Sequence, residues 1–385
     1  MPEAVVKKPK KPKSSAKKPK GLEPAMKRWD ELPSFIQTSV IEKLPFETRY
    51  SLSKCSKKMM EIEKVPPVFI HRFELLESEL FKMEPVDAYD KAIIVTVDFV
   101  KVPSHKSIPI IFLKTGNDTE VSREYIPHSF RSDEVPTIYE NTDYIEKSLE
   151  LFEKLMKRSR NRVVELSIDM PSWDISKSAV KEVNCEMFQI RFNNIDQLNQ
   201  GLEMLGEQVK NLRAFFKFEG AKPETKLVPK EILEHKQIQN AEILFIRGNC
   251  QFTEELFMSL KGKELNFSSS TISDAMYNKF ILRWIDGGGV DDFQKLSAWY
   301  PKEFNEQIIL KNVMCKLWDD KFKKDNERFL NEFFFAYGKD SCYQVLRKDG
   351  RQSATIAVSE QEVLFLVTGK FCEKTDRMEY YCTSE

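Results

Sequence analysis

The sequence lacks the patterns that organise most metal, redox and nucleotide sites. Its seven cysteines are scattered with no CxxC pair, so their spacing supports neither a zinc site nor a disulfide framework. Only four histidines occur, none at metal-ligand spacing, and GxSxG, GxGxxG and GxxxxGK[ST] motifs are missing. These absences predict a protein that is not an enzyme and that needs no metal or cofactor.

Long apolar runs are missing as well. Stretches such as Ile93–Val95 are far shorter than the ~18 residues that a membrane helix needs. The amino-terminal region is rich in Lys and Pro and has no apolar stretch that would serve as a secretory signal. We therefore expect an intracellular protein with reduced thiols, in the nucleus or the cytoplasm, without a membrane partner.

The charge balance hides an asymmetry. Lys+Arg and Asp+Glu number 60 each, yet the first 20 residues hold eight Lys and one Glu and so carry +7, which leaves −7 on the rest. Like charges and prolines predict a disordered tail over residues 1–25. Its lysines form a candidate nuclear-import signal: Lys7, Lys8, Lys10, Lys11 and Lys13.

Two other interpretations of this tail remain open. It can act as a nucleic-acid patch or simply as a solubilising segment. The tail has no aromatic residue on which a base could stack, and this disfavours a nucleic-acid partner.

A compact helical stretch follows the tail. Ile36, Val40, Ile41 and Leu44 fall at helical spacing and form one apolar stripe that ends at Pro45. Two more short helices are predicted, over 48–55 and from a cap at Ser56 to about residue 65. So small a unit buries little surface and gains stability by docking on a partner.

Strand and helix patterns alternate farther on. The predicted strands are 92–100, 107–113, 163–168, 187–192, 212–218, 241–246, 265–267 and 293–299. The predicted helices are 145–156, 195–205, 230–235, 254–260 and 273–285, with Ser273 as a cap. Residues 116–142 are expected to form a loop. This rhythm predicts an α/β domain of leucine-rich-repeat-like strand–helix units, with an ordinary α/β sheet as the alternative.

The carboxy-terminal part has a different pattern. Asp349-Gly350 stands between alternating runs at 343–346 and 355–358, which is typical of a hairpin. A third run at 363–367 completes an antiparallel β-meander.

Two stretches together resemble a known family. The segments Trp29–Pro33, Val40–Pro45 and Arg49–Ser56 are similar to the successive elements of an F-box, although Arg49 stands where many F-boxes have Leu, and Met59 where many have Trp. Farther on, 273–288 and 343–356 resemble the later part of the F-box-associated domain of the nematode-expanded F-box families.

This resemblance implies a domain organisation. The expected parts are a tail over 1–25, a three-helix F-box over 27–70, an F-box-associated α/β recognition domain over 90–370, and a C-terminal tail over 371–385.

The resemblance also implies a function. F-box proteins bind a Skp-family adaptor and through it a cullin, so the chain is expected to be the substrate-recognition subunit of an SCF-type cullin–RING ubiquitin ligase. The expected adaptor contacts are the apolar residues of the motif: Leu32, Pro33, Val40, Ile41, Leu44, Pro45 and Leu52. The alternative is a nuclear scaffold, or a nucleic-acid binder using the Lys tail, without a ligase role.

One aromatic residue is a candidate for target recognition. Trp173 follows Met170-Pro171-Ser172 just beyond a predicted strand, where an exposed side chain could anchor the unknown protein substrate. The carboxylate pairs Asp291-Asp292 and Asp319-Asp320 are adjacent in sequence and are interpreted as solvated faces.

Overall fold

The structure is a computed structural model. It describes residue 29 and residues 32–44, 46–81, 89–99, 109–122, 136–207, 209–217, 227–299, 303–318, 342–359 and 362–380. The chain divides into two compact units, Met1–Pro67 and Val68–Glu385. Across the described residues, no helix combines the length and the apolar character that crossing a membrane requires.

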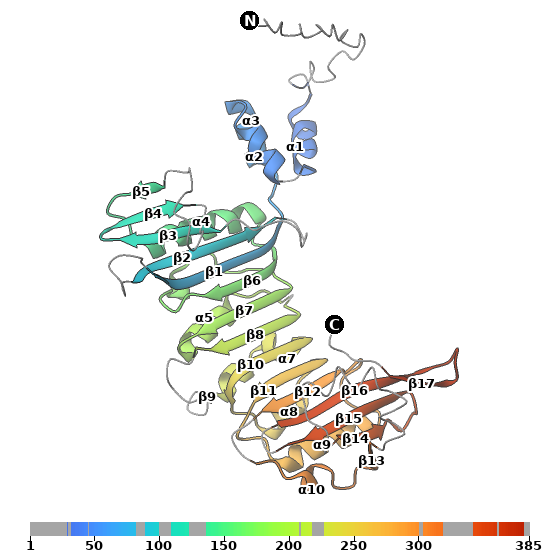
Figure 1. Cartoon of the computed structure of the whole chain (residues 1–385). Helices are drawn as coiled ribbons and strands as arrows, with labels where there is room; N and C mark the ends of the chain where they lie inside the picture. The colour runs from blue at the N-terminus through green and yellow to red at the C-terminus, as the bar shows by residue number, and fades with distance from the viewer. Residues whose placement is uncertain are drawn as a thin grey trace, which may run out of the picture. The chain divides into compact units, whose positions relative to one another are not determined.

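The first unit contains three short helices (Figure 1). They are α1 (Ser34–Glu42), α2 (Phe46–Ser53) and α3 (Lys57–Lys64). The Ser56 side chain accepts a hydrogen bond from the backbone N–H of Met59 and so caps α3, as predicted. Each helix has only two to three turns, so packing between them must supply most of their stability.

The second unit is built on one large mixed sheet. Its central strands pair in parallel and in chain order: β1 (Ile70–Phe81), β6 (Val163–Asp169), β7 (Met187–Phe192), β8 (Asn211–Phe216), β10 (Ile243–Cys250), β11 (Glu264–Ser268) and β12 (Lys295–Trp299). The short β9 (Leu227–Val228) pairs with the end of β10.

Antiparallel strands extend both sides of this parallel centre. Beside β1 follow β2 (Tyr89–Asp98), β3 (Ile110–Thr115), β4 (Asp118–Ser122) and β5 (Thr137–Tyr139). Beside β12 follow β16 (Glu362–Cys372), β15 (Gln352–Val358), β14 (Cys342–Leu346) and β13 (Cys315–Leu317), and β17 (Arg377–Tyr380) pairs with the end of β16. The predicted meander is confirmed, and its turn places Gly350 at a φ of 70°.

Helices connect the strands. They are α4 (Tyr144–Ser159), α5 (Ile195–Glu203), α6 (Lys230–Leu233), α7 (Lys236–Asn240), α8 (Glu254–Ser259), α9 (Asp274–Ile285) and α10 (Glu306–Ile309), with a short 3-10 helix, η2 (Ile175–Lys177). The helices α4, α5, α7, α8 and α9 lie behind the sheet in Figure 1, on one of its faces. Ser273 caps α9 as predicted.

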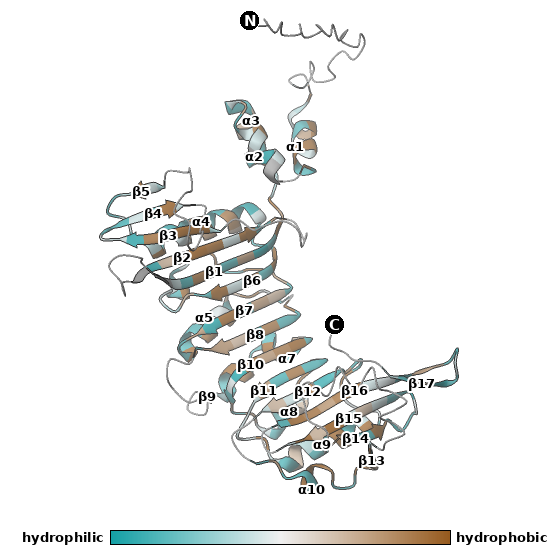
Figure 2. Ribbon diagram, in the orientation of Figure 1, coloured by the Kyte–Doolittle hydropathy of each residue, from teal (hydrophilic) through white to brown (hydrophobic). Residues whose placement is uncertain are grey.

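The core lies between these helices and the sheet. One row of side chains runs straight across seven strands in register, and each is at most 1% exposed: Leu166, Phe188, Leu212, Leu244, Leu265, Leu296 and Phe365. Each such side chain contributes about 1.5–3 kcal/mol by leaving water. At the far side of the sheet, β15 and β16 are buried on both faces, and Figure 2 shows their hydrophobic character.

Three local features of the structure differ from the expectations. The strand β1 was not predicted, because its Glu- and Leu-rich sequence suits a helix and only pairing with β2 and β6 makes it a strand. The predicted loop at 116–142 contains β4 and β5. The predicted C-terminal tail over 371–385 contains β17, a polar strand held by the edge of β16.

The overall class is thus a mixed α/β fold with a large sheet and several helices. A parallel sheet in chain order is found in repeat folds and in ordinary α/β sheets alike. The leucine-rich-repeat-like arrangement and the predicted domain boundaries therefore stay predictions.

Candidate functional site

The first helix of the small unit has one buried side and one exposed side. Gln37 and Ile41, four residues apart, point inward and are 2% and 0% exposed. The Gln37 amide donates a hydrogen bond to the carbonyl of Trp29, which ties the helix to the segment before it. Phe35 and Val40 remain 67% and 41% exposed. The helix therefore uses a narrow stripe for its own core and leaves large apolar side chains at the surface.

A buried ion pair joins the other two helices. The guanidinium of Arg49 on α2 lies 3.4 Å from the carboxylate of Glu63 on α3, and these side chains are only 4% and 7% exposed. Arg49 also donates hydrogen bonds to the carbonyls of Pro66 (3.0 Å) and Pro67 (2.9 Å). These contacts fix α2 against the segment that ends α3. Arg49, which departs from the F-box pattern, thus has a structural role inside this unit.

The structure separates the predicted adaptor contacts into different environments. Leu32, Pro33 and Val40 are exposed, whereas Leu44 and Leu52 are half-buried. Pro45 lies outside the described residues. Ile41, in contrast, is fully buried within the unit. The adaptor contacts as a set stay a prediction.

Sequence reasoning missed several exposed apolar side chains of the same unit. Phe35, Met60 and Val65 are 67%, 38% and 66% exposed. Among the described residues, these side chains leave apolar surface that the three helices do not cover. The sequence signal that could have identified Phe35 is its position outside the apolar stripe of Ile36, Val40, Ile41 and Leu44. We call Leu32, Phe35 and Val40 the α1 surface.

The candidate for target recognition in the second unit is not exposed. Trp173 is 3% exposed, and its ring meets that of Phe152 on α4 edge to face at 5.5 Å between centroids. The side-chain amide of Gln197 donates hydrogen bonds to the carbonyls of Met170 and Pro171, which holds the turn that carries the indole. The expectation of an exposed recognition aromatic at Trp173 is therefore wrong, and the residue belongs to the core.

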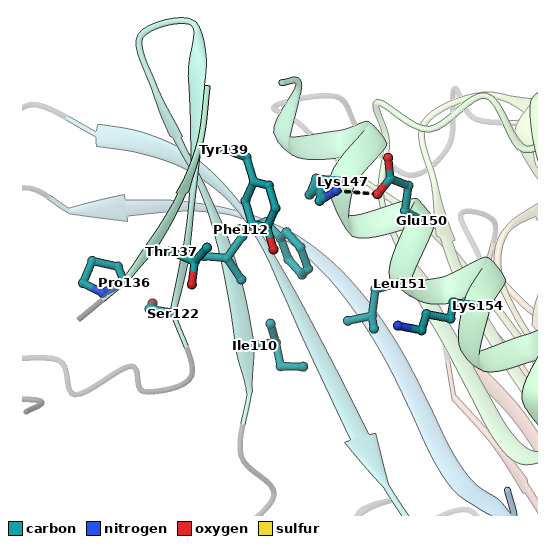
Figure 3. A pocket seen from close by; sticks show the side chains of 11 residues that line it. Ile110, Phe112, Ser122, Pro136, Thr137, Tyr139, Lys147, Glu150, Leu151 and Lys154 are labelled. Carbon is teal, nitrogen blue, oxygen red and sulfur yellow. Dashed lines mark hydrogen bonds and ion pairs between the residues drawn. The ribbon is translucent and has the colours of Figure 1, made fainter. Parts of the chain in front are cut away.

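A groove lies between α4 and the outer strands β3, β4 and β5 (Figure 3). It has a volume of about 600 Å³, and Phe112 and Leu151 line it. The ammonium group of Lys147 stands 4.4 Å from the centre of the Tyr139 ring and 2.6 Å from the carboxylate of Glu150. The groove is thus lined by both polar and apolar side chains, with Lys147, Glu150 and Lys154 of α4 along one side.

Burial works against the activation of three of the thiols. Burial raises the pKa of Cys185 to about 12, and it also raises the pKa values of Cys250 and Cys315. A thiol with a raised pKa is a poor nucleophile at neutral pH. Within the described ranges, no group of three or more His, Cys, Asp or Glu residues could hold a metal ion.

The predicted import signal falls outside the part of the chain that the structure describes. Lys7, Lys8, Lys10, Lys11 and Lys13 all belong to that segment. Their role stays a prediction.

Comparison with known proteins identifies one relative. The chain is 26% identical over 348 residues to an uncharacterized F-box protein of Caenorhabditis elegans, and the match covers 89% of each protein. No family model matches the chain. No solved structure matches it either. The similarity extends over both units and confirms the resemblance to a nematode F-box protein that the sequence motifs indicate.

Proposed function

We propose that the chain is the substrate-recognition subunit of an SCF-type cullin–RING ubiquitin ligase. The helical unit binds a Skp-family adaptor, and the α/β unit captures a protein target. The protein itself performs no bond chemistry. It raises the effective concentration of the target's lysines near the charged conjugating enzyme.

The observation that carries this proposal is the α1 surface. Leu32, Phe35 and Val40 are exposed on a unit of three short helices, in a chain similar over most of its length to an F-box protein. Interfaces place apolar and aromatic side chains at their centre and charges at their rim. Lys43 and Glu42, both exposed at the end of α1, suit such a rim.

Co-purification of the full chain with a recombinant Skp-family adaptor tests the proposal. Burying one apolar side chain of this kind contributes about 1.5–3 kcal/mol, so loss of two from an interface weakens binding by roughly 100-fold or more. We therefore expect the double variant Leu32→Asp with Val40→Asp to recover no adaptor.

A matched control guards against a general effect of added charge. Leu227 and Leu346 are 45% and 54% exposed in the second unit, and Leu227→Asp with Leu346→Asp makes the same chemical change there. This control should recover the adaptor at the wild-type level. Equal recovery with both double variants would contradict a binding role for α1.

The Lys tail supports a second, compatible proposal. With eight Lys in its first 20 residues, the tail suits nuclear import of the receptor. Fusion of residues 1–25 to a fluorescent reporter should concentrate it in the nucleus, and alanine at Lys7, Lys8, Lys10, Lys11 and Lys13 should abolish that concentration. A uniformly distributed wild-type fusion would contradict this role.

A further inference from the structure

The face of the parallel sheet opposite the helices carries a group of arginines and aromatic rings. Strand register places Arg191 beside Phe215 and Phe215 beside Arg247, one residue from each of β7, β8 and β10. Two residues earlier along the same strands, and on the same face, Arg213 of β8 lies beside Phe245 of β10. We call these five residues the arginine–phenylalanine face.

Burial confirms which way these side chains point. Their neighbours along each strand, such as Ile190, Leu212 and Leu244, are at most 1% exposed and pack against the helices, and alternate residues of a strand face opposite sides. Arg191 and Arg247 are exposed, and Phe215 and Phe245 are half-buried. Figure 1 shows α4, α5, α7, α8 and α9 on the other side of the sheet, and Figure 2 shows the mixed hydropathy of β7, β8 and β10.

The side chains of this face are held in place. The rings of Phe215 and Phe245 lie 5.0 Å apart, and Phe245 lies 5.6 Å from the Trp299 ring of β12. Arg191 bonds at 3.0 Å to the carboxylate of Asp169, which is 9% exposed. Preorganised aromatic and arginine side chains are those that carry most binding energy in protein interfaces.

The positive charge of the arginine–phenylalanine face is confined to three neighbouring strands. None of β7, β8 and β10 contains an Asp or Glu, yet they contribute three arginines. Acidic residues flank them on both sides: Asp169 on β6, which pairs with Arg191 and Lys217, and Glu264 on β11, which lies beside Lys295 of β12. The strip of arginines is thus about three strands wide, and the charges beside it are largely balanced.

We propose that the arginine–phenylalanine face binds a short acidic segment of the protein target, in which carboxylates flank an apolar side chain. The carboxylates pair with the arginine guanidinium groups, each of which donates two parallel hydrogen bonds to a carboxylate, and the apolar side chain rests on the phenylalanine rings. Arg191 and Arg247 are two strand spacings apart, about 10 Å, which an extended segment spans in about three residues. A strip only three strands wide disfavours a long polyanion such as single-stranded nucleic acid, which needs a continuous basic groove.

This inference rests on the proposed function and names the chemistry of its target. The test uses the full chain, with the double variant Arg213→Glu and Arg247→Glu. Its matched control is Arg351→Glu with Arg377→Glu, which makes the same charge change at two exposed arginines of the C-terminal hairpins. Adaptor co-purification of each preparation reports separately on the proposed function, and the face variant should retain the adaptor.

The probes are dodecapeptides selected from a random phage-displayed library on the wild-type protein, then synthesised with a fluorescent label. We expect selected sequences rich in Asp and Glu around an apolar residue. Their affinity should fall on the order of tenfold per reversed arginine in the face variant and stay unchanged in the control. Replacing their Glu by Gln should have a similar effect.

Several outcomes would overturn the proposal. One is selection without enrichment of acidic residues, and another is equal binding by the face variant and the control. Tighter binding of a labelled oligouridylate than of any peptide, lost in the face variant, would assign the face to nucleic acid. Wild-type dimers in light scattering that the face variant abolishes would assign it to a second copy of the chain.

Discussion

The buried pair of Arg49 and Glu63 allows a quantitative test of how the helical unit holds together. Replacing Arg49 by Met removes the cation 3.4 Å from the Glu63 carboxylate and two donors to the carbonyls of Pro66 and Pro67. Because both side chains are less than a tenth exposed, solvent screens this loss little. Breaking one partner of such a pair costs about 3–5 kcal/mol.

That cost is large for this unit. Whole domains are stable by only about 5–15 kcal/mol, and a unit of three short helices belongs near the lower end. Arg49→Met should therefore leave the helical unit largely unfolded and the large sheet intact. Hydrogen exchange measured by mass spectrometry should show fast exchange of the amides in 34–64 and unchanged protection in β6 to β12.

A second change serves as the control. In the double variant Arg49→Met with Glu63→Met, neither buried charge remains, and two apolar side chains take their place. Such replacements are close to neutral or stabilising, so protection of 34–64 should return. Wild-type protection in the single variant, or a double variant as unprotected as the single one, would refute the reasoning.

Four further results are expected. Ile41→Ala leaves a cavity in the helical unit and should destabilise it by about 2–5 kcal/mol in urea unfolding followed by exchange of 34–64, and a loss under 0.5 kcal/mol would place Ile41 outside the core. Trp173→Ala should lower the free energy of unfolding of the sheet unit by about 3–5 kcal/mol, which an exposed recognition residue would not do. Burial raises the pKa of Glu362, so folded protein loses stability as pH rises through that pKa. Glu362→Gln keeps the acceptor for its hydrogen bonds, and it should therefore raise the melting temperature at pH 7 but not at pH 4, whereas an equal effect at both would contradict the titration. Deleting residues 1–20 should leave adaptor recovery unchanged, and its loss would give the tail a part in docking.

Local patterns in the sequence predicted much of the fold. The strand Met187–Phe192 has the predicted bounds because alternating apolar residues specify a half-buried strand without help from the rest of the chain. Ser273 was recognisable as a cap because capping depends on one side chain and the N–H groups next to it. Asp349-Gly350 likewise specifies its turn locally.

The features that were missed depend on distant partners. The strand β1 is rich in helix-forming residues and is extended only because β2 and β6 pair with it. Trp173 is buried because Phe152, on a helix 21 positions earlier, covers it. Arg49 looked like a departure from the F-box pattern, and only its buried partner on α3 explains it.

The candidate site was likewise predicted only in part from the sequence. Leu32, Pro33 and Val40 were identified from the motif and are exposed, whereas Ile41 belongs to the core and Phe35 was missed. Two residues side by side in a helix sequence face directions about 100° apart, so the motif alone did not separate Val40 from Ile41.

The central claim is that the helical unit docks a Skp-family adaptor while the α/β unit remains free for a target. Hydrogen exchange of the full chain, measured with and without saturating recombinant adaptor, tests it most directly. The account predicts added protection confined to residues 32–64, strongest in α1, with strands β7, β8 and β10 unchanged. Absence of any added protection, or protection that falls on the sheet and not on α1, would contradict it.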